Sequence, residues 1–290
     1  MWPAPPGPPH DGYEAEIGDW LERSNRFGPL PELTARIRAT GRRAGIWVAP
    51  FLVGANSRVA REHPGWLVGG ADGGHGWGQA LYVLDVTHPE AAEHLTHVFR
   101  TLAADGFGYF KLDFIYAGAI AGRRHADADP VAAYRRGLEL IRAGAGEDAV
   151  IVGCGAPLLP SIGLVDAMRV SPDIHAEWQP EEFGGDITQP GMRSALTTGR
   201  ARAWMHGRWW VNDPDCLLVR PAVEQRERWA AHLRAYSGLA ASSDPLEQLD
   251  ERGLELTREL LRPSSPAPVR WNPLAGPDQG LIGAAAESSS

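Results

Sequence analysis

Short apolar segments alternate with helical segments along most of this 290-residue sequence, and this alternation restricts the folds that it can adopt. The apolar segments have the composition of buried parallel strands and lie at 45–51, 81–86, 109–114, 150–155, 167–173, 208–213 and 239–245. Most of them are separated by segments with helical periodicity, at 31–41, 88–106, 129–144, 223–238 and 244–262. The sequence therefore predicts an α/β fold around a parallel sheet.

Both a doubly wound open sheet and a TIM (β/α)8 barrel fit this alternation. No glycine-rich nucleotide-binding turn follows the first strand, and polar residues recur at the carboxyl ends of the strands. These residues are Asp85, Asp113, Cys154, Asp173, Asp213 and Asp244. Because a TIM barrel builds its active site from several strand ends, we expect a barrel over residues 11–262. The proline-rich residues 1–10 and the Pro-, Ser- and Gly-rich residues 263–290 are expected to be disordered.

The first barrel strand is expected just before residues 11–13, where the sequence instead reads PPGPPH. Proline removes hydrogen-bond donors from a sheet, so the barrel is predicted to lack a proper first strand and to expose two edges. We therefore expect poor stability or aggregation unless a partner chain supplies the missing edge. A homo-oligomer is one arrangement left open.

Composition restricts the partners and the compartment. The net charge of −8 and the pI near 5.7 argue against nucleic acid or an anionic membrane as a partner. No apolar run is long enough to span a membrane. Two cysteines and an N-terminus without signal-peptide features favour the cytoplasm.

The segment YFKLDF at 109–114 places two opposite charges inside a predicted buried strand. Its apolar face holds Phe110, Leu112 and Phe114, and its polar face holds Tyr109, Lys111 and Asp113. Lys111 is the only lysine of the sequence. Charges are buried mainly where they are paired or functional, so this face predicts a site. The alternative is that the only lysine of the sequence lies in this strand by chance.

A second strand, AMRVSPD at 167–173, repeats the arrangement with Arg169 and Asp173. Two carboxylates that face one cleft are the equipment for glycosidic bond hydrolysis. The Lys111 cation favours an ionised Asp113, the candidate nucleophile. Asp173, expected to be buried without a close partner, is the candidate acid. Arg169 is expected to lie deeper and to bind a sugar hydroxyl without fully neutralising Asp173. Structural ion pairs are the alternative for both aspartates.

Other barrel chemistries fit less well. An enolase-type metal site requires acids at three successive strand ends, and after Asp85 and Asp113 the next strand ends at Cys154. Asp113 disfavours the neutral amine that a Schiff base would require of Lys111. His94 and His97 have helical spacing and are interpreted as a solvated helix face.

The motifs GIWVAPFLVGANSRVAREHPGWLV (45–68), LYVLDVTHPEA (81–91), YFKLDF, GCGAPLLPSIGLVDAMRVSPD (153–173) and NDPDCLLVR (212–220) carry a resemblance. With them the sequence resembles the catalytic barrel of the α-galactosidases of glycoside hydrolase family 36. The resemblance implies a retaining α-galactosidase that acts on terminal α-galactosyl residues of oligosaccharides and needs no metal or organic cofactor. It also implies that Asp113 is the nucleophile, that Asp173 is the acid/base, that Lys111 and Arg169 bind sugar hydroxyls, and that Cys154 lines the pocket.

The sequence departs from the family pattern at the first strand. Members usually show Asp-Asp-Gly followed by Trp or Tyr, whereas this sequence reads His10-Asp11-Gly12-Tyr13, so Asp11 is the retained sugar-binding aspartate. The β-domains that usually flank the barrel are also missing from this sequence. We interpret it as a truncated family member. Another α-glycoside specificity, a transglycosylase and an inactive barrel fragment remain alternatives.

Overall fold

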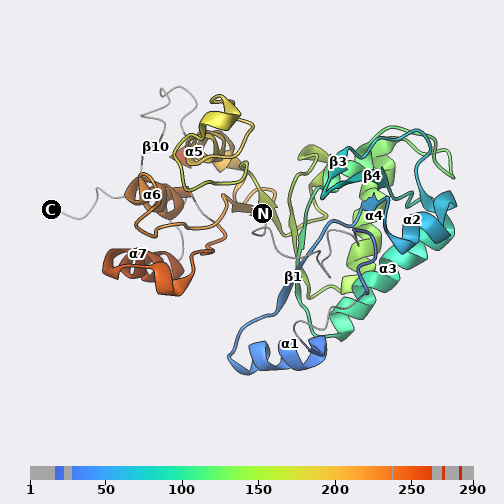
Figure 1. Cartoon of the computed structure of the whole chain (residues 1–290), viewed down its shortest axis with the longest axis horizontal. Helices are drawn as coiled ribbons and strands as arrows, with labels where there is room; N and C mark the ends of the chain where they lie inside the picture. Colours follow the sequence, from blue (N-terminus) through green and yellow to red (C-terminus); the bar gives the residue numbers. More distant parts are fainter. Residues whose placement is uncertain (1–16, 23–27, 237, 263–269, 272–280, 283–290) are drawn as a thin grey trace. The chain divides into compact units, whose positions relative to one another are not determined.

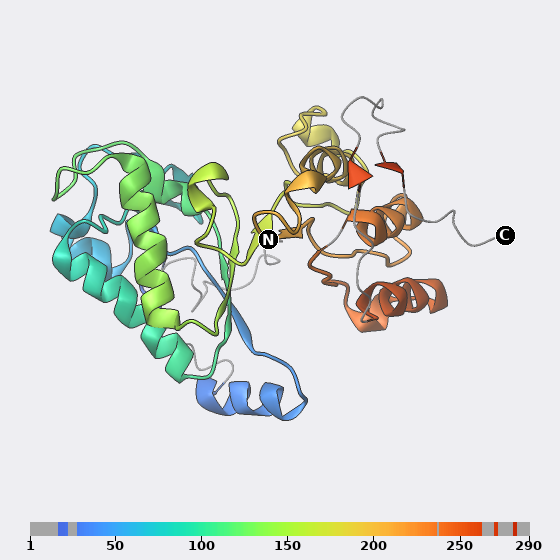
Figure 2. The same ribbon diagram turned by 180° about the vertical axis from the view of Figure 1, so that it is seen from behind.

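The structure of the chain is a computed structural model that describes residues 17–22, 28–236, 238–262, 270–271 and 281–282. It divides into two compact units, Trp2–Asp166 and Ala167–Ser290. Figures 1 and 2 show the chain from opposite sides. The predicted head and the place of the missing first strand lie outside the described residues.

The first unit contains three hydrogen-bonded parallel strands, β1 (Gly45–Val48), β5 (Tyr109–Leu112) and β6 (Val150–Gly153). β5 is central and pairs with both of the others. Helices α3 (Pro89–Ala104) and α4 (Pro130–Ala145) run side by side along the sheet (Figures 1 and 2). This arrangement confirms the predicted α/β class.

The alternation in β5 follows the predicted faces. Phe110 and Leu112 are fully buried, and the Phe110 ring packs edge-on against Phe99 of α3 with their centroids 5.4 Å apart. Lys111, on the opposite face, is half-buried. The expectation that Phe114 shares the buried face is wrong, because this residue lies beyond the strand in a left-handed conformation, with φ of 51°.

The segment 81–86 was expected to be a strand of the parallel sheet, and this prediction is wrong. It contributes to β4 (Gln79–Val83), which pairs antiparallel with β2 (Leu52–Gly54) and with β3 (His75–Gly76). Residues along β4 are alternately buried and exposed, as in an antiparallel strand that is covered on one face. β1 consequently pairs directly with β5.

The remaining elements of the first unit are helices, most of them short. They are α1 (Leu30–Ala39), α2 (Arg58–Glu62), and the 3₁₀ turns η2 (Pro64–Trp66), η3 (Ile115–Ala119) and η4 (Leu159–Ser161). The Asp19 carboxylate accepts hydrogen bonds from the backbone N–H groups of Arg58 and Val59, at 2.7 and 3.1 Å. Asp19 thereby satisfies donors that the first turn of α2 leaves unpaired.

The second unit holds a parallel pair, β7 (Ala167–Arg169) and β8 (Val211–Asp213). Its other elements are α5 (Met192–Arg202), α6 (Arg226–Tyr236), α7 (Glu251–Leu261), the 3₁₀ turns η5 (Glu181–Phe183), η6 (Ala203–Met205) and η7 (Leu246–Gln248), and an antiparallel pair, β9 (Arg270–Trp271) and β10 (Leu281–Ile282). β9 and β10 lie in the segment for which the sequence predicts disorder. Buried side chains around Trp229 of α6 form the hydrophobic core of this unit, among them Met192, Leu217, Leu233 and Leu256.

The strand expected at 239–245 is reduced to one isolated bridge between Leu217 and Ser242. Beyond this bridge the segment does not continue as a strand. The Asp244 carboxylate accepts hydrogen bonds from the backbone N–H of Val219 and from the Arg220 guanidinium. Pro245, next in the chain, has no N–H to donate. Within neither unit do the described residues close into a barrel.

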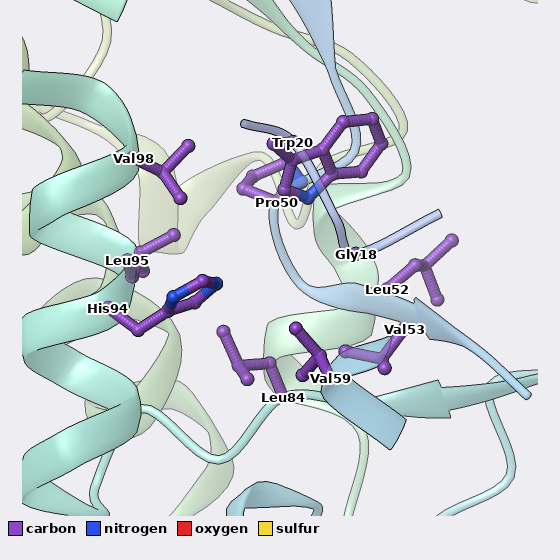
Figure 3. A pocket seen from close by; sticks show the side chains of 10 residues that line it. All are labelled: Gly18, Trp20, Pro50, Leu52, Val53, Val59, Leu84, His94, Leu95 and Val98. Atoms are coloured by element: carbon purple, nitrogen blue, oxygen red, sulfur yellow. The ribbon is translucent and has the colours of Figure 1, made fainter. Parts of the chain in front are cut away.

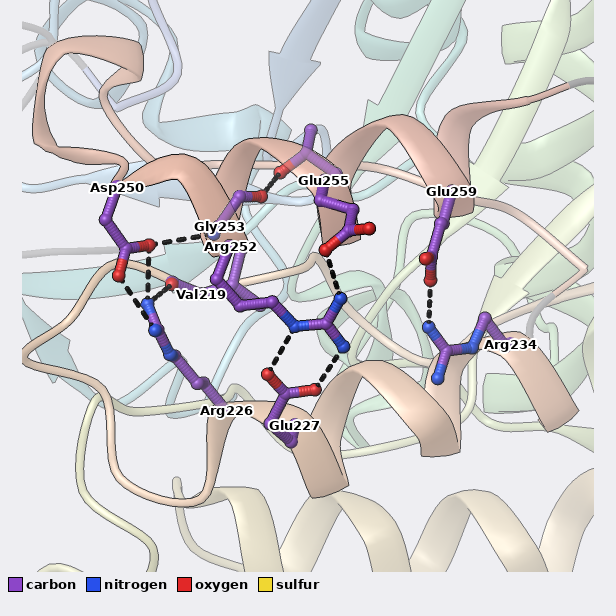
Figure 4. A network of polar contacts seen from close by, with 10 residues as sticks. Val219, Arg226, Glu227, Arg234, Asp250, Arg252, Gly253, Glu255 and Glu259 are labelled. Atoms are coloured by element: carbon purple, nitrogen blue, oxygen red, sulfur yellow. Dashed lines mark hydrogen bonds and ion pairs between the residues drawn. The ribbon is translucent and has the colours of Figure 1, made fainter.

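Helices α6 and α7 are linked by ion pairs (Figure 4). The Arg226 guanidinium donates two hydrogen bonds of 2.8 Å to the Asp250 carboxylate. The Arg252 guanidinium donates two of 2.7 Å to the Glu227 carboxylate. Asp250 also caps α7 by accepting the backbone N–H of Gly253. These side chains are partly exposed, so each pair adds little to the stability of the unit.

His232 of α6 is buried among aromatic rings. Its ring is stacked between Trp229 and Tyr236, with centroid separations of 5.2 and 4.7 Å, and is 3% exposed. Neither ring nitrogen has a hydrogen-bond partner among the described residues. Burial, reinforced by the nearby Arg200 charge, lowers the pKa of His232 to about 3.

We therefore expect the second unit to lose stability in mild acid. The folded-state pKa lies below the unfolded value, so the unfolded chain takes up the proton first as the pH falls. The contribution of His232 is fully present above pH 6.5 and declines towards pH 3, by about 2 kcal/mol at pH 5. Urea unfolding at pH 7.5 and pH 5 should show a smaller decline in His232→Phe. Equal declines in the variant and the wild type would contradict this assignment.

Candidate active site

Asp113 follows the last residue of β5 and is held from two sides. One carboxylate oxygen, Oδ2, accepts the indole N–H of Trp47 at 2.9 Å, and Oδ1 accepts the backbone N–H of Phe114 at 2.9 Å. The backbone N–H of Asp113 itself donates to the carbonyl of Val48, also at 2.9 Å. The ends of two neighbouring parallel strands thus orient one half-buried carboxylate.

Lys111 comes two residues before Asp113, on the same face of the YFKLDF segment. It is in register with Trp47 of β1 and Val152 of β6. Among the described residues, no ion pair joins Lys111 to Asp113. The groups that touch the carboxylate directly are therefore uncharged N–H donors. The predicted role of Lys111 in binding a sugar hydroxyl stays a prediction.

Cys154 follows β6 at the same end of the sheet and is buried. Its backbone N–H donates to the carbonyl oxygen of Leu112 at 2.8 Å. Gly155 next to it has a φ of 55°, and a Cβ there would lie 3.3 Å from the Cα of Phe114. The structure therefore brings Lys111, Asp113 and Cys154 to one end of the sheet, as the sequence predicts.

Four aromatic rings form a cluster beside this carboxylate, here called the aromatic corner: Trp20, Trp47, Trp77 and Phe114. Trp47 meets Trp20 and Trp77 edge-on, with centroid separations of 5.9 and 6.4 Å. Trp77 in turn meets Phe114 at 5.3 Å. No sequence pattern singles out Trp77, whereas Trp47 could have been found from its place in the strand GIWVAPF.

Two members of the aromatic corner are held in an unfavourable backbone conformation. Trp77 and Phe114 have φ of 50° and 51°, a region that bulky residues rarely adopt. Each such residue costs on the order of 1–3 kcal/mol and persists only where the surrounding structure enforces it. Phe114 follows Asp113 in the chain, and Trp77 packs against Phe114, so both strained residues belong to the aromatic corner beside the candidate site.

The second unit contains a buried charge cluster centred on Arg169. The guanidinium lies 2.9 Å from Asp215, 3.3 Å from Asp213 and 2.8 Å from Asp173. The side chains of Arg169, Asp213 and Asp215 are 7%, 7% and 9% exposed. Burial, followed by the Asp215 charge, raises the pKa of the neighbouring Cys216 thiol to about 12, so this cysteine stays neutral.

Asp173 differs from its predicted environment. Its side chain is 48% exposed and pairs directly with Arg169, so the expectation of a buried carboxyl without a close partner is wrong. Arg169 itself is deep, as predicted. Sequence reasoning missed Asp215, although its motif NDPD was visible; nothing in the spacing showed that it would share Arg169 with Asp173.

Asp11 lies outside the described residues. Asp113 belongs to the first unit and Asp173 to the second. The catalytic and sugar-binding roles of these residues therefore remain predictions.

The two histidines at helical spacing lie on α3 but in different environments. His97 is exposed, whereas the His94 ring turns inward to a cavity of about 10 Å³ lined mainly by aliphatic side chains (Figure 3). Burial, with added repulsion from His63, lowers the pKa of His94. The interpretation as a solvated face thus holds only for His97. Groups of three or more side chains placed to bind a metal do not occur in the described part of the chain. Nor does that part contain a helix that is long and apolar enough to cross a bilayer.

Comparison with known proteins shows what the chain is similar to. Residues 10–138 match the family described as Melibiase. Alpha-galactosidase from Escherichia coli is 30% identical over 135 residues, which cover 44% of this chain and 19% of that protein. A solved structure of the α-galactosidase from Thermus thermophilus, in complex with p-nitrophenyl α-D-galactopyranoside, is 36% identical, with a TM-score of 0.77.

The match to the Thermus structure covers 92% of this chain and 56% of that one. The chain thus spans about half the length of this structure and under a fifth of the Escherichia coli protein. An α-galactosidase from Lactobacillus brevis, at 15% identity and a TM-score of 0.62, shares the fold. In sequence and in fold, the chain is similar to α-galactosidases, and residues 10–138 match the melibiase family.

Proposed function

We propose that this protein is a retaining α-galactosidase that releases terminal α-galactosyl residues from oligosaccharides. The observation that carries the proposal is the Asp113 carboxylate at the end of β5, oriented by Trp47 and Phe114 and bordered by aromatic rings. Relatives named α-galactosidase support the substrate class, since one of them is solved with an α-galactoside and another structure with stachyose.

The proposed reaction is a double displacement. Asp113 attacks the anomeric carbon and forms a covalent galactosyl ester, while Asp173 protonates the departing glycosidic oxygen. Asp173 then removes a proton from water, and the resulting attack on the anomeric carbon releases galactose and frees Asp113. The configuration at the anomeric carbon is inverted twice and so retained.

The surrounding residues suit the proposed roles. Asp173 is half-exposed, so a leaving group can reach it, and Arg169 fixes its position through an ion pair of 2.8 Å. Lys111 and Asp11 are proposed to bind sugar hydroxyls together with Arg169, and Cys154 to line the pocket. No cofactor takes part in these steps. The low cysteine content, with both thiols free, supports action in the reducing cytoplasm.

Nitrophenol release tests this proposal on the purified wild-type protein. We expect hydrolysis of p-nitrophenyl α-galactoside and little or none of the β-galactoside or the α-glucoside. Proton NMR during turnover should show α-galactose as the first sugar formed. Faster hydrolysis of the α-glucoside would contradict the proposed specificity for galactose. β-Galactose as the first product would contradict the retaining mechanism. Transfer of galactose to an added sugar faster than to water would indicate a transglycosylase.

A further inference from the structure

Trp77 occupies a turn position that is poorly suited to tryptophan. It is the first of two residues that join β3 to β4, and both have positive φ, 50° for Trp77 and 74° for Gly78. This is the geometry of a type I′ hairpin, in which Asn-Gly and Asp-Gly are the favoured pairs. Glycine satisfies the second position, whereas a bulky ring at the first makes the hairpin less stable than asparagine would.

The Trp77 ring compensates for this only in part through packing. It is half-buried and meets Trp47 and Phe114 edge-on, at interplanar angles of 69° and 83°. Contacts of this kind bury less area than a fully enclosed tryptophan would. The position is therefore poorly explained by the stability of the hairpin alone.

The two rings that Trp77 touches are the residues that bond Asp113. Trp47 donates its indole N–H to Oδ2, and Phe114 donates its backbone N–H to Oδ1. Trp77 thus lies one ring farther from the carboxylate than Trp47. Strain held beside a reactive carboxylate is expected where a side chain serves binding rather than folding.

We infer that Trp77 is a specificity-determining residue that stacks on the leaving-group sugar of the substrate. The inference rests on the proposed function. The galactosyl ring must lie against Asp113, and therefore beside Trp47, when its anomeric carbon is attacked. The next ring out, Trp77, is then placed to meet the sugar that departs. Pyranose rings present apolar C–H groups that an indole surface covers well.

Binding to a catalytically inactive background tests this inference without requiring turnover. Galactose and an α-1,6-galactosyl-glucose disaccharide are titrated calorimetrically into Asp113→Ala and into Asp113→Ala with Trp77→Asn. We expect the second change to weaken disaccharide binding about 3- to 10-fold and to leave galactose binding unchanged. The same change should raise the thermal midpoint, because Asn-Gly suits the turn.

The control is Tyr82→Asn, which removes an exposed aromatic ring from β4 of the same hairpin and should alter neither affinity. Equal weakening of galactose and disaccharide, or no weakening of either, would overturn the inference, as would a lower thermal midpoint without a change in affinity. The proposed function is tested separately by wild-type hydrolysis, so the failure of one is distinguishable from the failure of the other.

Discussion

Asp113→Ala is expected to lose at least about 10³-fold in kcat towards p-nitrophenyl α-galactoside, while the protein stays folded. The variant lacks the oxygen that would form the glycosyl ester, and among the described residues of the first unit no other carboxylate accepts the N–H groups of Trp47 and Phe114. Nitrophenol release under saturating substrate measures the loss, and circular dichroism shows whether the fold is retained.

The matched control is Asp166→Asn in the same unit. The Asp166 carboxylate accepts the backbone N–H of Ile151 near the amino end of β6, whereas Asp113 follows the carboxyl end of β5. Its loss removes a hydrogen-bonded aspartate without touching the candidate site, so activity should persist. Comparable loss in both variants would show that the effect of Asp113→Ala is structural.

Arg169→Met is expected to lower the free energy of unfolding by about 3–5 kcal/mol. The change leaves Asp213 and Asp215 buried without their cation, and charges in that position are costly. Methionine keeps much of the side-chain volume, so cavity formation contributes little. Urea unfolding at neutral pH measures the difference from the wild type.

Arg226→Met provides the comparison within the same unit. Arg226 also binds a carboxylate with two hydrogen bonds, but its partner Asp250 is 40% exposed. Solvent screening should limit the loss there to about 0–1 kcal/mol. Adding Asp213→Asn and Asp215→Asn to Arg169→Met should recover part of the lost stability. A loss for Arg169→Met no larger than that for Arg226→Met would contradict the buried cluster.

The fold class could be predicted because short apolar strands and periodic helices are local patterns. The faces of β5 followed from a period of two, and Phe110 and Leu112 are buried as that period requires. Strand pairing could not be read in this way. The segment 81–86 has the composition of a central strand, yet a two-residue turn before β4 directs it into an antiparallel sheet with β2 and β3.

The candidate site was predictable where a charge interrupts an apolar strand, as at Lys111 and Asp113. It was not predictable where a residue acts through contacts distant in sequence. Trp47 reaches Asp113 across 66 residues, and Asp213 reaches Arg169 across 44. The environment of Asp173 was predicted wrongly for the same reason, since exposure depends on which segments cover a strand end.

Covalent trapping of the glycosyl-enzyme tests the central claim most directly. An activated fluorinated α-galactoside slows the second displacement, so the ester accumulates and can be located by peptide mass spectrometry. The assignment predicts one fluorogalactosyl unit on the wild-type protein, attached to Asp113, and none on Asp113→Ala. Attachment to another residue, or steady hydrolysis without any labelled peptide, would contradict the role of Asp113 as the nucleophile.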